Sequence, residues 1–237
     1  QWVFGMRTYS LTAAGEVLSS YSRNGSWNLA RIADGQMQDI DVPYTDVGAP
    51  QAVGDRIVFI GSSALAAPAV VAWDPATGTG DVLKSSLETA PDVVELSEPE
   101  AITFETTDGA VAYAFYYPAR NGAYTGPDDA APPLLVRGHG GPTGASSPSF
   151  SLAIQYWTNR GFAVLDVNYR GSTAFGREYR EALYGAWGVA DVDDMEAGAQ
   201  HLVSRNLADP ERLAIRGGSA GGYTALAALA FRDTFSA

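Results

Sequence analysis

A short apolar run that leads into a serine flanked by glycines constrains this chain more than any other feature. Residues 213–216 have the composition of a buried strand, and residues 220–232 are rich in alanine and leucine, which favours a helix. Residues 217–221 between them read Gly-Gly-Ser-Ala-Gly and match the nucleophile elbow, a strained strand-to-helix turn. Glycines on both sides of the serine let the strand and the helix approach closely. We therefore predict that Ser219 is a catalytic nucleophile.

The same kind of turn also occurs at dinucleotide and phosphate sites, so the pattern alone leaves both interpretations open. A second motif, His-Gly-Gly-Pro at residues 139–142, directly follows another apolar run at residues 134–136. Consecutive glycines after a strand allow backbone amides to face a ligand, and an oxyanion hole takes its second donor from such a loop. Its first donor is the amide of the residue after the nucleophile, Ala220. The two motifs together favour the nucleophile over a plain tight turn.

Composition excludes several functions. A net charge of −12 argues against a nucleic-acid partner, because phosphate binding needs a basic face. The chain has no cysteine and two histidines, so we expect no disulfide, no metal and no cofactor. No stretch approaches the roughly 20 apolar residues of a membrane helix. We expect a cytoplasmic location, although the first residues, 1–4, already resemble a strand and the true N-terminus is expected to be missing.

The N-terminal part of the chain has an all-β pattern. Its short apolar runs are broken by Gly, Asn, Asp and Pro. A weak repeat relates residues 15–35 to residues 55–75 at a spacing of about 40, close to the period of a four-stranded propeller blade. Because a propeller closes with at least four blades, residues 1–95 are predicted to be the C-terminal part of a β-propeller. A small sandwich or a pair of meanders is the alternative.

The pattern changes after an acidic, proline-bounded linker at residues 91–99. A hairpin is predicted around Asp108 and Gly109, and residues 121–133 are expected to be an exposed loop. Strands and helices then alternate, as in a parallel sheet with crossover helices. Residues 96–237 are therefore predicted to form an α/β domain. Its expected strands are at 134–136, 162–167 and 213–216, and its expected helices are at 149–159, 178–183, 191–205 and 220–232.

Neither histidine occupies the position along the chain that a catalytic base would have. With a nucleophile elbow the triad runs in the order Ser, Asp or Glu, His, but His139 precedes the serine, so we assign it to shaping the oxyanion loop. His201 reads as a surface or half-buried residue. The acid and base are expected beyond Ala237, so the isolated chain is predicted to be inactive. The strand at 213–216 is then expected to be an unpaired edge of the sheet. Such an edge favours association, and a homo-oligomer is the expected form.

Five ordered blocks resemble the prolyl oligopeptidase family of serine peptidases. They are most similar to its acylaminoacyl-peptidase and dipeptidyl-aminopeptidase-like branch. The resemblance implies an α/β-hydrolase domain, truncated here after the nucleophile helix, that follows the last blades of a β-propeller. The blocks are residues 133–143, 155–164, 167–173, 187–194 and 216–223.

The resemblance also implies roles for individual residues. Ser219 would be the nucleophile, and the amides of Gly141 and Ala220 would hold the tetrahedral oxyanion. Tyr169 and Tyr223 would lie near the substrate, although Tyr223 could instead pack the start of its helix. The acidic residues at 191, 193 and 194 are interpreted as fold elements, with Asp191 as a helix cap and no metal site.

The family's propeller restricts entry, which implies short peptides as substrates. The leading hypothesis is a serine peptidase that removes short units from the amino end of peptides. Two alternatives stay open: an esterase or small-molecule amidase on the same fold, and a truncated, non-catalytic binding module.

Overall fold

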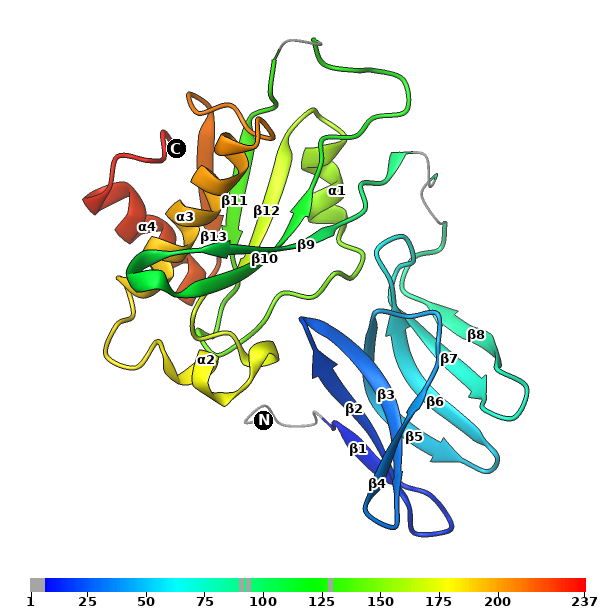
Figure 1. Ribbon diagram of the computed structural model, residues 1–237. Coiled ribbons are helices and arrows are strands. Elements are labelled where there is room, and N and C mark those ends of the chain that lie inside the picture. Colours follow the sequence, from blue (N-terminus) through cyan, green and yellow to red (C-terminus); the bar gives the residue numbers. More distant parts are fainter. Residues whose placement is uncertain (1–6, 90–91, 93–94, 128–129) are drawn as a thin grey trace. The chain divides into compact units, whose positions relative to one another are not determined.

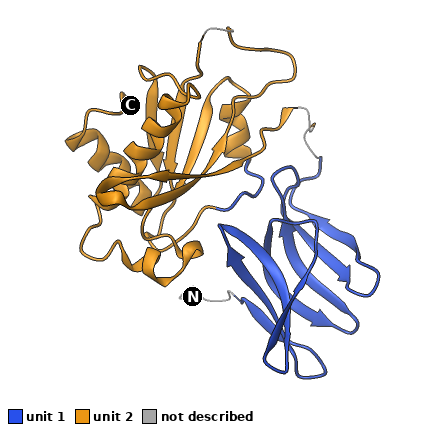
Figure 2. Cartoon of the chain, viewed as in Figure 1, with its two compact units in different colours: residues 1–90, 147–151 blue, residues 91–146, 152–237 orange. Residues whose placement is uncertain are grey.

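The computed structural model describes residues 7–89, 92, 95–127 and 130–237, which Figure 1 traces in sequence order. The chain forms two compact units, coloured separately in Figure 2. One comprises residues 1–90 and 147–151, and the other comprises residues 91–146 and 152–237. The expected linker lies partly outside the described residues, as does the strand expected at residues 1–4.

The first unit contains two four-stranded antiparallel sheets, each with its strands in sequence order, as in propeller blades. The repeat in the sequence corresponds to the central hairpins of the two sheets, β2–β3 and β6–β7. Buried residues such as Leu29 and Val71 form the apolar core of this unit. The strands are β1 Tyr9–Leu11, β2 Val17–Arg23, β3 Ser26–Ala33, β4 Gln36–Ile40, β5 Asp46–Val53, β6 Arg56–Ser62, β7 Ala69–Asp74 and β8 Thr79–Ser85.

Residues 147–151 belong to this unit, although the sequence assigned them to the α/β domain. The Ser147 hydroxyl donates a hydrogen bond to the Asp46 carboxylate at 2.9 Å, and the Phe150 amide donates to the Ser63 carbonyl at 2.8 Å. These contacts use residues that are far from position 147 in the sequence, so a local pattern gives no sign of them.

The second unit is built on a five-stranded mixed sheet in the order β13-β11-β12-β10-β9. Strands β9 and β10 form the predicted hairpin, and β10 also pairs antiparallel with β12. Strand β11 runs parallel to both β12 and β13, which confirms the predicted α/β class. The strands are β9 Glu100–Glu105, β10 Val111–Tyr117, β11 Leu134–Gly138, β12 Ala163–Asn168 and β13 Leu213–Gly217.

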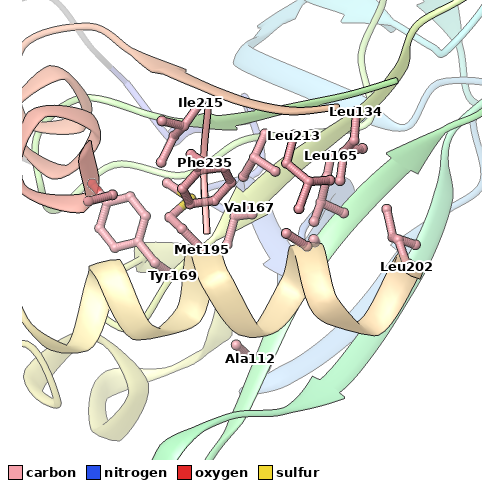
Figure 3. Close-up of a cluster of buried hydrophobic side chains, with 14 of the residues drawn as sticks. Ala112, Leu134, Leu165, Val167, Tyr169, Met195, Leu202, Leu213, Ile215 and Phe235 are labelled. Carbon is pink, nitrogen blue, oxygen red and sulfur yellow. The ribbon is translucent and has the colours of Figure 1, made fainter. Parts of the chain in front are cut away.

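Among the described residues, four α-helices accompany this sheet: α1 Leu152–Thr158, α2 Arg177–Glu181, α3 Ala190–Ser204 and α4 Ala220–Phe231. Helix α1 begins three residues later than predicted, because residues up to 151 join the first unit. Helix α3 buries Met195, Ala199 and Leu202 against the sheet, and Figure 3 shows Met195 and Leu202 among the strand residues that they face. No helix in the described ranges has both the length and the apolar character needed to cross a membrane.

Strand β13 ends the sheet, but its outer edge is not wholly unpaired. The Ser236 amide donates a hydrogen bond to the Leu213 carbonyl at 2.9 Å, and the Ile215 amide donates to the Ala237 carbonyl at 2.7 Å. The prediction that this strand lies at the edge of the sheet is confirmed, although the backbone after α4 hydrogen-bonds to part of that edge. The physical reason is burial of Phe235, whose ring joins the core and brings the following backbone alongside β13.

Candidate active site

Ser219 occupies the turn between β13 and α4 in a backbone conformation that an L-residue rarely adopts. Its φ is 54° and its ψ is −120°, and such strain costs on the order of 1–3 kcal/mol. Within the described residues no side chain is hydrogen-bonded to its hydroxyl. The serine is thus held in the geometry of a nucleophile elbow with its hydroxyl unengaged.

The loop after β11 packs directly against this turn. A β-carbon added at Gly221 would lie 2.8 Å from the His139 carbonyl oxygen, and one added at Gly140 would lie 3.4 Å from the β-carbon of Ser219. The absence of a side chain at Gly221 permits this approach, and Gly140 lies beside the serine. In the described part of the chain, neither the Gly141 nor the Ala220 amide donates a backbone hydrogen bond. Ala220 follows Ser219 directly in the elbow, and the role of the two amides as oxyanion donors stays a prediction.

His139 fixes this loop and is not placed as a base. Its Nδ1 lies 2.9 Å from the Gly140 carbonyl oxygen, and its Nε2 lies 2.7 Å from the Ser172 hydroxyl. Burial lowers the pKa of His139, the hydrogen bond to Gly140 opposes this, and the positive charge of Arg137 adds to the lowering. The loop-shaping role proposed for His139 agrees with these contacts. Its partner Ser172 was missed, because nothing in its sequence position points to a histidine 33 residues away.

Tyr169 is fully buried, so the structure does not expose it to a substrate. Its ring stacks on that of His139, with centroids 4.4 Å apart, and its hydroxyl donates to the His139 carbonyl at 2.9 Å. Burial raises its pKa far above the ordinary value, so the hydroxyl keeps its proton. The tyrosine thus packs against His139 in the loop after β11, and its place near the substrate stays a prediction.

Tyr223 lies one helical turn after Ser219 and is half exposed. Its ring lies against Trp187, with centroids 4.9 Å apart. A β-carbon at Gly188 would lie 2.8 Å from the Tyr223 hydroxyl oxygen, so the glycine makes room for the ring. Both interpretations of Tyr223 agree with this position, because one part of the side chain packs and another part is open to solvent.

The acidic residues near the start of α3 serve the fold. Asp194 forms a 2.8 Å ion pair with Arg170, and Asp193 forms a 2.9 Å ion pair with Arg232. Asp191 accepts hydrogen bonds from the Gly188 amide at 2.6 Å and from the Thr224 hydroxyl. Across the ranges that the structure describes, no group of three or more His, Cys, Asp or Glu residues is placed to hold a metal ion.

The predicted helix-cap role of Asp191 needs correction. Helix α3 begins at Ala190, and the preceding residue is Val189, so Asp191 lies inside the first turn. From there its carboxylate joins α3 to α4 through Thr224, a contact that sequence reasoning did not find.

His201 is the other histidine of the chain. It lies on α3 with its ring 5.8 Å from that of Phe104, and burial lowers its pKa. No hydrogen bond joins either histidine to Ser219 in the described residues. The base that would activate the serine is therefore not found among the contacts of this part of the protein.

The mixed sheet and the strained serine turn define the second unit as an α/β-hydrolase segment with a nucleophile elbow. The model of the prolyl oligopeptidase family matches residues 148–237. This segment, which contains Ser219, is therefore similar to the prolyl oligopeptidase family.

Known proteins of this family resemble the chain over different lengths. The structure of a Mycobacterium tuberculosis puromycin-hydrolyzing peptidase superposes with a TM-score of 0.94 at 40% identity, covering 99% of this chain and 36% of that one. A dipeptidyl aminopeptidase BIII from Pseudoxanthomonas mexicana is 34% identical over 77% of this chain and 27% of its own length. An acylamino-acid-releasing enzyme from Arabidopsis thaliana is 38% identical over 38% of this chain and 12% of its own. The chain thus spans little more than a third, or less, of these relatives.

Proposed function

We propose that the protein to which this chain belongs is a serine peptidase that hydrolyses short peptides from the amino end. The acyl group removed would be an acylaminoacyl or a dipeptidyl unit. The observation that carries the proposal is the strained Ser219 with Gly140 packed against it. The relatives support the substrate class, since they are described as a puromycin-hydrolyzing peptidase, a dipeptidyl aminopeptidase and an acylamino-acid-releasing enzyme.

The proposed chemistry is acyl transfer in two steps. The Ser219 hydroxyl attacks the peptide carbonyl carbon and loses its proton to a base, while the Gly141 and Ala220 amides stabilise the oxyanion. The C–N bond then breaks, the leaving amine takes a proton, and an acyl-enzyme remains on the serine. Water hydrolyses this ester and restores the hydroxyl. A missing oxyanion donor costs about 10² to 10³ in turnover.

The base and its acid partner are proposed to come from outside residues 1–237. The support is that neither histidine of the chain contacts Ser219, while the matched M. tuberculosis structure is nearly three times as long as the aligned region, since 36% of it is covered. A serine without its base loses on the order of 10⁶ in turnover. We therefore expect the isolated segment to be inactive and the full-length protein to be active.

The test uses the full-length protein with 4-nitroanilides of free amino acids, acetylated amino acids and dipeptides. Hydrolysis of one of these series that is abolished in Ser219→Ala and retained in Ser204→Ala is the expected result. Ser204 is a suitable control because it is exposed at the end of α3. Turnover of esters alone would favour the esterase alternative. Absence of all turnover, and of fluorophosphonate labelling of Ser219, would favour the binding module. Ser219-dependent turnover by residues 1–237 alone would contradict the external base.

A further inference from the structure

A cavity of about 200 Å³ opens beside the oxyanion loop. One wall is formed by Pro142 and Thr143, which directly follow the predicted oxyanion donor Gly141. The opposite wall comes from the segment between α2 and α3, through Leu183, Tyr184 and Trp187. No function has been assigned to this segment so far, and its position next to the loop distinguishes it from the rest of the surface.

Both walls are connected to the nucleophile elbow. Pro142 is one residue from Gly141, and Trp187 packs its ring on Tyr223. Tyr223 in turn donates its backbone amide to the Ser219 carbonyl at 3.2 Å. A peptide bound with its scissile carbonyl at Ser219 would therefore have a neighbouring side chain within reach of this cavity.

The cavity wall is held in place by packing. Leu183 is only 5% exposed, and a β-carbon at Gly171 would lie 2.6 Å from one of its methyl carbons. The Ala186 amide donates to the Leu183 carbonyl at 3.0 Å, and the Gly188 amide is held by Asp191. These contacts fix the segment before any ligand arrives, and a preformed pocket binds with less loss of conformational entropy.

The lining determines which ligand fits. Proline, leucine, tyrosine and tryptophan present apolar and aromatic surface, and aromatic groups pack favourably on such walls. Arg180 is the one charged residue among those lining the cavity, and its guanidinium lies 3.3 Å from the Glu181 carboxylate in a partly buried contact. A lysine or arginine side chain entering the cavity would meet this like charge.

We propose that this cavity is a substrate subsite for an apolar or aromatic side chain on a residue that flanks the scissile bond. The subsite rests on the proposed peptidase function and adds a side-chain preference to it. Basic side chains are disfavoured there because of Arg180.

The experiment measures kcat/KM of the full-length protein on two peptide series. One series varies the residue on the acyl side of the scissile bond among Phe, Ala and Lys, and the other varies the residue on the leaving side. Tyr184→Ala is expected to lower the Phe-to-Ala ratio about 5- to 10-fold in one series, which identifies the side that the cavity serves. Arg180→Glu is expected to raise the Lys-to-Ala ratio about tenfold in that same series.

Matched controls are available on the same unit. Tyr124 is exposed to a similar extent as Tyr184, 79% against 72%, and lies outside the cavity. Arg177 is exposed on the same helix as Arg180 and does not line the cavity. Tyr124→Ala and Arg177→Glu should leave every ratio unchanged.

The outcomes separate the two proposals. Unchanged ratios in both series, with hydrolysis that still depends on Ser219, would overturn the subsite and leave the peptidase in place. If the wild type shows no Ser219-dependent hydrolysis, the proposed function fails and the subsite with it. Should Tyr184→Ala unfold in a thermal melt, the Arg180→Glu variant decides the question alone.

Discussion

Gly217 and Gly221 pack so closely that a β-carbon on residue 217 would overlap the carbonyl group of Gly221. This contact closes the elbow between β13 and α4 and holds Ser219 in its strained conformation. Gly218, between them in the sequence, has open space where its β-carbon would be. Neighbouring glycines thus have different structural importance, which leads to the first prediction.

Gly217→Ala should lower the free energy of unfolding by about 3 kcal/mol or more, because overpacking against backbone forces the turn to shift. Chemical denaturation would measure the loss. Gly218→Ala is the matched control and should stay within about 0.5 kcal/mol of the wild type. Equal stability of the two variants would contradict the packing described for the elbow.

The strain at Ser219 predicts that glycine at this position gives a more stable fold than alanine does. Glycine adopts positive φ freely, so Ser219→Gly should be about 1 kcal/mol more stable to denaturant than Ser219→Ala, even after the entropic cost of glycine in the unfolded chain. Both variants should lose labelling by a fluorophosphonate. If the alanine variant were the more stable of the two, the backbone at 219 would not be under strain.

The ion pair between Arg170 and Asp194 is almost fully buried, since the two side chains are 13% and 0% exposed. Asp194→Ala should lower the free energy of unfolding by about 3 kcal/mol, because it leaves the guanidinium without its partner. The double change Arg170→Met with Asp194→Leu should recover most of this loss. Denaturation of Arg170→Met, Asp194→Leu and the double variant forms a cycle with the wild type, and an additive result would show that the pair is not coupled.

His139 predicts a pH dependence of stability. Its pKa is lowered by burial from the ordinary value of 6.5, so below that pH the unfolded chain takes up a proton that the folded state resists. The contribution of His139 is therefore complete above pH 6.5 and decreases as the pH falls towards the folded-state pKa. His139→Asn, which keeps an amide donor for the Gly140 carbonyl, should lack this decrease.

The measurement is the difference in unfolding free energy between wild type and His139→Asn from pH 8 to pH 5. Taking the difference cancels buried carboxylates such as Asp166 and Asp194, whose pKa values are raised by burial and whose contributions have the opposite sign. A flat difference would mean that His139 titrates alike in both states.

The glycine positions around Ser219 and after β11 predicted the elbow and its neighbouring loop. Their steric requirement is local, because a turn that tight excludes side chains wherever it occurs. Apolar runs of strand and helix length likewise predicted the α/β class and the two antiparallel sheets before it. The sequence predicted the ends of helices less accurately than their presence. Residues 149–151, which were expected to begin α1, belong to the other unit.

Side-chain partners separated along the chain were decided by tertiary structure. Strand β11 lies between β12 and β13, and this crossover brings His139 to Ser172 and Gly140 to Ser219. The same packing buries Tyr169, which the sequence placed near the substrate, and lines the cavity beside Pro142 with residues from 180–187. The sequence by itself determined which residue types could form a nucleophile turn, since that depends on local backbone sterics. Only the tertiary structure decided which side chains face it, because that depends on how distant strands pair.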